Sequence, residues 1–182
     1  MLIFLDLETS GLRPEKHVIL EVGVVLTQDD LTIQDQESWV VKQSVNLDEI
    51  DPNVVRMHTK NGLWVVVDQK GLPQGAVEAD VIAWLDARVN WRSAWTMAGN
   101  SIHFDRSFLR RHMPELDDRF HYRLVDVSSF KEMMQRWLPK KFNDRPIRRS
   151  THRAVPDCLG SIEELSYYRD IILGAQGSNT TV

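Results

Sequence analysis

The chain has 182 residues, which suits one domain whose core is large enough to need no disulfide. Its net charge of −4 excludes a global basic field for nucleic acid, so any such site must be local. The single cysteine excludes an intramolecular disulfide, and no apolar run approaches the roughly 18 residues of a membrane span. Because the first residues turn acidic at Asp6 and lack a basic leader, we expect a cytoplasmic protein.

The predicted elements begin with three strands. Apolar and β-branched runs predict strands over 2–8, 17–27 and 37–45, and their short connections favour an antiparallel meander. Further strands are expected over 94–100 and 123–129, each followed by a helical segment. The order of the elements predicts one mixed α/β domain.

Four helices are expected from apolar residues at helical spacing. They lie over 76–89, 105–113, 128–138 and 156–173. Ser128 or Ser129 is expected to cap the third helix, and Pro156 suits the first turn of the last one.

The remaining segments carry weaker signals. Residues 46–63 are typical of short helix and loop, and residues 65–75 of strand or loop. Residues 139–156 are polar, broken by proline and rich in Lys and Arg, which is typical of a solvated loop. We expect the domain to span residues 1–173, with 174–182 as a disordered tail.

Two acids lie at the end of the first predicted strand. Asp6 and Glu8 are two residues apart, so their side chains project from the same face. Adjacent carboxylates repel unless a cation lies between them, and Mg²⁺ and Mn²⁺ prefer oxygen ligands. An isolated Asp-x-Glu is nevertheless short and common, and by itself is typical of a turn residue beside an exposed acid.

Two further acids and a histidine follow along the chain. Asp105 starts a predicted helix directly after a strand, and Asp157 starts the last helix, five residues after His152. Alone, each acid is typical of a carboxylate stabilised by a helix dipole, and His152 of a surface loop. The order of all five residues is far more specific than any one of them.

This pattern resembles that of the exonucleases named for four acids and a histidine, and among them the oligoribonucleases. The motifs that carry the resemblance run from about residue 2 to residue 173. They are "FLDLETSGL", "VILEVGVV", "VRMHTKNGL", "GNSIHFDRSFLRRHMPEL", "FHYRLVDVSSFKE" and "STHRAVPD". The resemblance implies a ribonuclease-H-like fold, which is a mixed five-stranded sheet flanked by helices. In that sheet a three-strand meander is followed by two parallel strands.

The resemblance also implies a reaction. The enzyme would be a 3′–5′ exoribonuclease that degrades short oligoribonucleotides, down to dinucleotides, to 5′-mononucleotides. The four acids Asp6, Glu8, Asp105 and Asp157 would hold two divalent ions, Mg²⁺ or Mn²⁺. His152 would be the general base that takes a proton from the attacking water.

Substrate contacts follow from the same resemblance. Leu12 matches a wedge between the two terminal bases, and His58 a residue that packs against a base. The positions that grip the 5′ phosphate are Ser101, Arg123 and Ser128. Tyr122 matches a residue that reaches into the neighbouring subunit's site, which implies a homodimer.

Each of these contacts has a simpler alternative. Leu12 could be a turn residue over the core, His58 a polar surface residue, and Tyr122 a core aromatic with its hydroxyl at the surface. For the whole chain, one alternative is a general 3′–5′ exonuclease for single-stranded DNA or RNA. Another is a non-catalytic module that binds dinucleotides.

Overall fold

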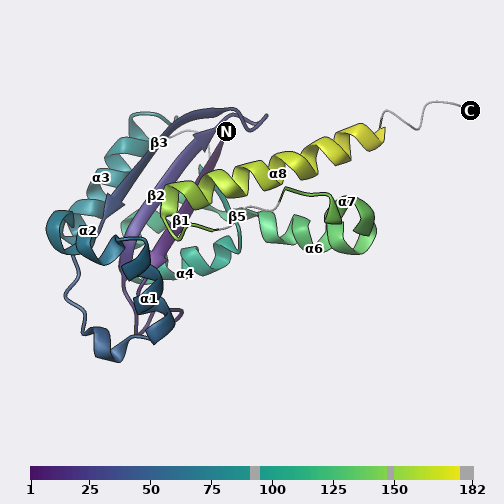
Figure 1. Ribbon diagram of the computed structural model, residues 1–182. Helices are drawn as coiled ribbons and strands as arrows, with labels where there is room; N and C mark the ends of the chain where they lie inside the picture. Colours follow the sequence, from purple (N-terminus) through teal and green to yellow (C-terminus); the bar gives the residue numbers. More distant parts are fainter. Residues whose placement is uncertain (91–94, 147–149, 177–182) are drawn as a thin grey trace, which may run out of the picture.

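A mixed five-stranded sheet forms the centre of the protein, seen here in a computed structural model (Figure 1). The structure describes residues 1–90, 95–146 and 150–176. The strands are β1 (Leu2–Thr9), β2 (Ile19–Thr27), β3 (Ile33–Val40), β4 (Trp95–Gly99) and β5 (Phe120–Asp126). Their order in the sheet is β3-β2-β1-β4-β5. β1, β2 and β3 pair antiparallel, whereas β4 is parallel to β1 and β5 is parallel to β4. The predicted ribonuclease-H-like sheet, a meander followed by two parallel strands, is confirmed.

The helices cover both faces of this sheet. They are α1 (Pro52–Lys60), α2 (Leu63–Lys70), α3 (Gln74–Asp86), α4 (Ile102–His112), α5 (Pro114–Asp117), α6 (Val127–Trp137), α7 (Pro139–Asn143) and α8 (Ala154–Gln176), with a short 3₁₀ helix η1 (Leu47–Glu49). α3 and α4 pack on one face, while α6 and α8 pack on the other (Figure 1). None of the described helices is long and apolar enough to cross a membrane.

The alternation of β1 assigns its residues to the two cores. Ile3, Leu5 and Leu7 point to the core under α3 and α4, whereas Phe4 lies in the core under α8. Asp6 and Glu8 are two and four residues after Phe4, so they share its face. The sequence pattern of β1 therefore places both acids under the helix that carries Asp157.

The end of the predicted strand over 37–45 differs from the structure. β3 ends at Val40, whose carbonyl oxygen accepts from the Leu72 amide, and the Lys42 amide donates to the Leu72 carbonyl oxygen. β3 is an edge strand with mostly exposed side chains, so its sequence lacks the apolar run that marks β2. The first residues of the predicted strand over 94–100 lie partly outside the described part of the chain.

Residues 65–70, expected as strand or loop, belong to helix α2. Their valines favour strands in isolation, but Leu63 and Val67 lie one helical turn apart and both pack against Leu20 of β2. Val65 points outward and is exposed. Tertiary burial of one helical face has overridden the local β preference.

Helix ends also differ from the sequence prediction. Asp126, rather than Ser128 or Ser129, caps α6, and its side chain accepts a hydrogen bond from the Ser128 amide at 2.9 Å. The predicted basic loop contains the short helix α7. α8 continues to Gln176, three residues past the expected domain end, and the rest of the predicted tail lies outside the described residues.

Gly23 allows the start of α8 to approach the sheet beside the acidic pair. It pairs with Asp6 across β1 and β2, and a Cβ at this position would lie 2.6 Å from the carbonyl carbon of Ala154. We therefore expect Gly23→Ala to push α8 outward and to lower the free energy of unfolding by about 1–3 kcal/mol, measured by urea denaturation.

Gly75→Ala is the matched control for this substitution. A Cβ at Gly75, in the first turn of α3, meets nothing within 4 Å. The same chemical change should therefore leave stability equal or slightly higher. An unchanged free energy of unfolding in Gly23→Ala would show that α8 does not depend on this close approach.

Candidate functional site

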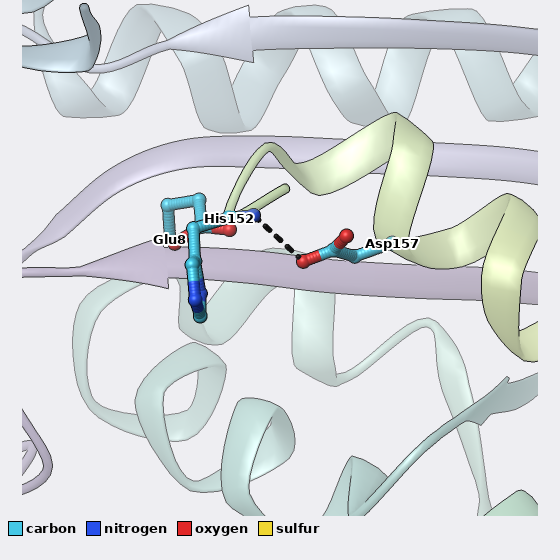
Figure 2. A group of neighbouring side chains, drawn as sticks. All are labelled: Glu8, His152 and Asp157. Atoms are coloured by element: carbon cyan, nitrogen blue, oxygen red, sulfur yellow. Dashed lines mark hydrogen bonds between the residues drawn. The ribbon is translucent and has the colours of Figure 1, made fainter. Parts of the chain in front are cut away.

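Glu8, His152 and Asp157 converge where β1 ends under the first turn of α8 (Figure 2). A ring nitrogen of His152 and a carboxylate oxygen from each acid all lie within 4.8 Å of one another. Glu8 is buried at 6% exposure, and the main-chain N–H of His152 donates to Oδ2 of Asp157 at 3.2 Å. Residues far apart in the sequence thus form one compact group of two carboxyl groups and an imidazole.

Asp105 reaches the same strand from α4. Its Oδ1 accepts a hydrogen bond from the main-chain N–H of Leu7, between the two acids of β1, at 2.9 Å. Burial raises the pKa of Asp105 to about 7, although the bond from Leu7 opposes this shift. Asp105 is therefore tied directly to the end of β1.

The electrostatics show that the four predicted acids act on one another. Burial, and then the charge of Asp105, raise the pKa of Asp6 well above its usual value. Burial, and then the charge of Asp157, raise the pKa of Glu8 to about 8. Carboxyl groups that resist ionisation in this way are stabilised by a nearby cation. Their oxygen atoms are also the ligands that hard divalent ions prefer, so this set of residues fits a metal ion.

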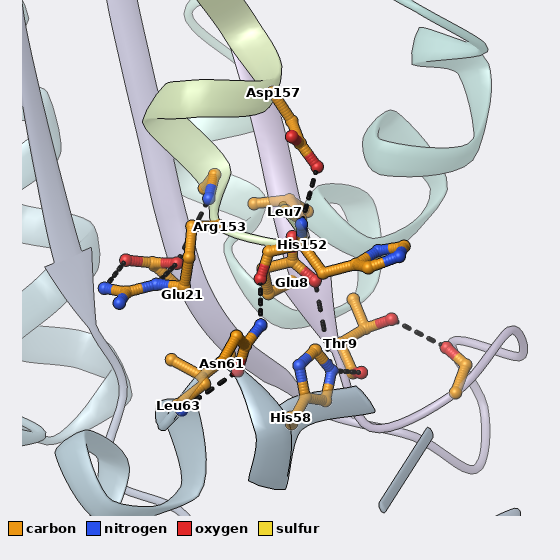
Figure 3. A network of polar contacts seen from close by, with 12 residues as sticks. Leu7, Glu8, Thr9, Glu21, His58, Asn61, Leu63, His152, Arg153 and Asp157 are labelled. Atoms are coloured by element: carbon orange, nitrogen blue, oxygen red, sulfur yellow. Dashed lines mark hydrogen bonds and ion pairs between the residues drawn. The ribbon is translucent and has the colours of Figure 1, made fainter. Parts of the chain in front are cut away.

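The sequence analysis missed a further acid beside the site, the buried Glu21 of β2. It pairs with Glu8 across the two strands and is 1% exposed. Both of its carboxylate oxygens bind the Arg153 guanidinium, at 2.7 and 2.9 Å, and one also accepts from the Ala154 amide at 3.1 Å (Figure 3). The only signal in the sequence was a charged residue inside an otherwise apolar strand.

This ion pair corrects the prediction that Arg153 belongs to a solvated basic loop. Its guanidinium forms a bidentate contact with the Glu21 carboxylate, which fixes the orientation of the two groups as well as their distance. The pair joins β2 to the residue that follows His152, so it anchors the last loop before α8. Arg148 and Arg149 of the same predicted loop lie outside the described residues.

His152 has an unusual main-chain conformation. Its φ of 53° lies in the left-handed region, which costs a non-glycine residue roughly 1–2 kcal/mol. Its N–H donates to Ser150 Oγ at 3.1 Å as well as to Asp157. Its carbonyl oxygen accepts from the Asn61 side chain (Figure 3). Contacts on both sides therefore hold His152 in this conformation.

The two residues predicted to contact bases differ in exposure. Leu12 is 76% exposed in the loop after β1, whereas His58 is fully buried. The His58 ring lies edge-on to Trp64, and its Nε2 is 3.1 Å from the Thr9 carbonyl oxygen. An enclosed ring has no face open to a base, so His58 in this arrangement supports the end of β1 instead.

Two of the three residues predicted to grip a 5′ phosphate lie together. The Ser101 amide donates to Ser128 Oγ at 2.9 Å, and the two hydroxyl oxygens are 3.1 Å apart. Asp126 also accepts from the Ser101 amide, at 3.0 Å. Arg123 is not part of this group in its present rotamer, because its guanidinium lies over the Tyr122 ring, 5.2 Å from the centroid. Tyr122 itself is 70% exposed.

A cavity of about 350 Å³ opens beside the acids. Asp6 and Asp157 line one part of it, and Lys131 and Arg145 line another. Asn100, also in its wall, accepts from Ser128 Oγ at 3.1 Å. The cavity thus borders two of the predicted acids and contains both cationic and acidic side chains, because Glu163 and Glu164 line it as well.

Comparison with known proteins gives a consistent result. The RNase_T exonuclease family matches residues 3–165. The oligoribonuclease of Corynebacterium diphtheriae is 39% identical over 92% of this chain and 81% of its own length. The oligoribonuclease of Tropheryma whipplei is 40% identical over 94% of this chain and 93% of its own. The oligoribonuclease of Neisseria meningitidis is 39% identical over 94% of this chain and 92% of its own length.

Solved structures agree on the fold. The zinc-bound complex of E. coli exonuclease I with single-stranded DNA has a TM-score of 0.71 over 93% of this chain. Another exonuclease I structure has a TM-score of 0.73 over 92%. Both are 15% identical, and the chain spans 40% of each. At this identity the likeness concerns the fold alone.

The raised carboxyl pKa values predict how stability depends on pH without metal. Folded Glu8 and Asp105 keep their protons to about pH 8 and 7, whereas in the unfolded chain they lose them near their ordinary values of 4.5 and 3.8. The folded state therefore binds more protons within this window. Stability should fall as pH rises from about 4 to 8, by at most about 1.4 kcal/mol per pH unit for each carboxyl.

Urea denaturation of chelator-treated protein at pH 5, 6, 7 and 8 tests this expectation. Mn²⁺ should restore the stability lost at pH 8, because binding to the folded state stabilises it. The variant Glu8→Gln should show a shallower decline, because one titrating carboxyl is gone. A metal-free protein whose free energy of unfolding rises steadily up to pH 8 would contradict the raised pKa values of Glu8 and Asp105.

Proposed function

The chain belongs to the oligoribonuclease family of 3′–5′ exoribonucleases, and we propose that it degrades very short RNA, down to dinucleotides, to 5′-mononucleotides. The observation that carries this proposal is the convergence of Glu8, His152 and Asp157 within 4.8 Å. With Asp6 and Asp105 beside them, every residue type that the reaction needs is present at one strand end. A cytoplasmic location, where short RNA fragments arise, is part of the same proposal.

Metal ions are assigned to the acidic group. Asp6, Glu8, Asp105 and Asp157 would hold two divalent ions, Mg²⁺ or Mn²⁺. When bound, such ions supply a water of lowered pKa and stabilise negative charge on the leaving 3′ oxygen. The chain's contribution is a set of buried carboxylates held by rigid elements, whose mutual repulsion favours cation binding.

His152 is assigned as the general base. Imidazole is the usual proton acceptor at physiological pH, and a ring nitrogen of His152 already lies among the acidic oxygens. Its position depends on contacts to its main chain rather than on burial of the ring, since the residue is exposed. The ring is therefore free to exchange protons with solvent after each turnover.

The 5′ end of the substrate is assigned to the group at the starts of α4 and α6. Ser101 and Ser128 offer hydroxyl donors, and helix N-termini favour phosphate. Arg123 would leave the Tyr122 ring and bind the phosphate in two places. The carboxylate of Asp126 already accepts from this site, so a phosphate would have to displace that contact.

Leu12 and Tyr122 complete the proposed substrate site. Leu12 follows β1, and its apolar side chain is 76% exposed, so we propose that it inserts between two bases. Tyr122 would enter the site of a second chain in a homodimer. Its 70% exposure on the single chain is compatible with such a partner contact.

A general single-strand exonuclease is the second candidate. Lys131 and Arg145 line the cavity beside the acids, and these cations would hold the phosphates of a longer strand once Lys131 exchanges its ion pair with Glu164, 3.7 Å away, for a phosphate. A closed 5′ site and an open channel predict different dependences of rate on substrate length.

A length series separates these candidates. Initial rates with Mn²⁺ on 5′-phosphorylated RNAs of about two, five, seven and twenty nucleotides, and on matching DNAs, should fall steeply beyond the dinucleotide. His152→Ala should lose about 10²–10⁴-fold in kcat at an unchanged melting temperature.

Other outcomes of the series have definite meanings. Equal rates at every length would favour the general exonuclease. Binding of dinucleotides without hydrolysis would favour the non-catalytic module. Full activity in His152→Ala would remove its assigned role as base.

The homodimer proposal is tested through Tyr122. Tyr122→Ala should lower kcat/KM for a dinucleotide about 10-fold, as expected from the loss of roughly 1–2 kcal/mol of stacking. The control is Trp137→Ala, whose side chain is equally exposed at 70% but lies at the end of α6. Mixing the Tyr122→Ala chain with the His152→Ala chain should restore activity, because a mixed dimer contains one complete site. Failure to restore it, with sedimentation showing only monomers, would contradict the proposal.

A further inference from the structure

Asn61 lies in the turn between α1 and α2, and its side-chain amide forms hydrogen bonds with two different segments (Figure 3). Its amide nitrogen donates to the carbonyl oxygen of His152 and lies 3.5 Å from that of Thr151. Its Oδ1 accepts from the Leu63 amide at 3.0 Å, at the start of α2. One short side chain therefore joins the α1–α2 turn to a loop about ninety residues later.

The bond to His152 matters because of the main-chain conformation there. With φ at 53°, His152 lies outside the regions that a non-glycine residue prefers, so it would relax if released. Asp157 and Ser150 hold its N–H, and Asn61 holds its carbonyl oxygen. Rotation about either main-chain bond of His152 would move the ring, so both contacts help to fix its direction, together with Ser150 Oγ, which lies 3.3 Å from the ring Nδ1.

The turn that carries Asn61 is itself fixed to the acidic strand. His58, one helical turn earlier on α1, is fully buried with its Nε2 3.1 Å from the Thr9 carbonyl oxygen and 3.9 Å from Oε2 of Glu8. The corner formed by α1 and α2 thus contacts the end of β1 on one side and the His152 loop on the other. It is one of the contacts that fix the imidazole relative to the acids.

We propose that Asn61 is a positioning residue that holds His152 in its left-handed conformation with the ring directed at the acidic group. This inference rests on the proposed role of His152 as general base. It assigns to the α1–α2 turn a part in the chemistry that acts through the main chain of His152.

Asn61→Asp separates this role from the cap of α2. Aspartate keeps the oxygen that accepts from the Leu63 amide but cannot donate to the His152 carbonyl. We expect kcat for a dinucleotide to fall about 10–100-fold, as for a catalytic group displaced by about 1 Å. KM and the melting temperature should change little, because substrate contacts and the helix cap remain.

Asn46→Asp is the matched control. Asn46 is the N-cap of η1, and its side chain likewise accepts a hydrogen bond from the amide two residues later, that of Asp48. This variant makes the same chemical change and adds the same charge, so its kcat should equal that of the wild type. Asn61→Ala removes the donor without adding charge and should show the same loss in kcat, with a lower melting temperature because the cap is lost. Normal kcat in Asn61→Ala would overturn the proposal.

A double-mutant cycle with His152→Ala completes the test. If Asn61 acts through the imidazole, Asn61→Asp should have no further effect once the imidazole is absent. The same fold loss in both backgrounds would overturn the positioning role while leaving His152 as base. Full activity in His152→Ala alone would instead remove the base itself, so the two failures are distinguishable.

Discussion

Four carboxyl groups meet at the end of β1, where Glu8 and Asp105 are buried and Asp6 and Asp157 are half-buried, so water screens their mutual repulsion poorly. Asp6 and Glu8 resist ionisation because α8 covers the strand, and Asp105 and Asp157 add to the repulsion. Such a cluster destabilises the fold on its own and becomes favourable with a cation between the oxygens. The close approach between Gly23 and the start of α8 keeps these acids near one another, so that their repulsion favours binding of a cation.

The surrounding contacts explain how a strained histidine can be placed beside that cluster. Glu21 and Arg153 tie the start of α8 to β2, and Asn61 ties the His152 carbonyl to the α1–α2 turn. Each contact comes from a different element, so no single loop fixes the imidazole. An exposed ring on a firmly held main chain combines access to solvent protons with a defined direction.

The proposed preference for short substrates rests on residues outside the acidic group. Ser101 and Ser128 lie close together at two helix starts, and Lys131 and Arg145 line the cavity beside the acids. The first pair suits a terminal phosphate, whereas the cations suit the phosphates of a continuing strand. The family relationship favours the proposed site that is closed around a 5′ phosphate over an open channel for a longer strand. Both proposals use the same acids and the same histidine.

The sequence by itself determined the meander, the order of the later strands and helices, and the four acids with His152. The elements depend on local periodicity, such as the alternation that puts Asp6 and Glu8 on one face of β1. The set of four acids and His152 depended instead on the resemblance of the ordered motifs to those of a known family. Tertiary structure alone decided that Val65 lies in a helix, that His58 is buried and that Glu21 pairs with Arg153. The partners in these contacts are separated by many residues along the chain. No local pattern encodes them, and only the packing of the folded chain selects them.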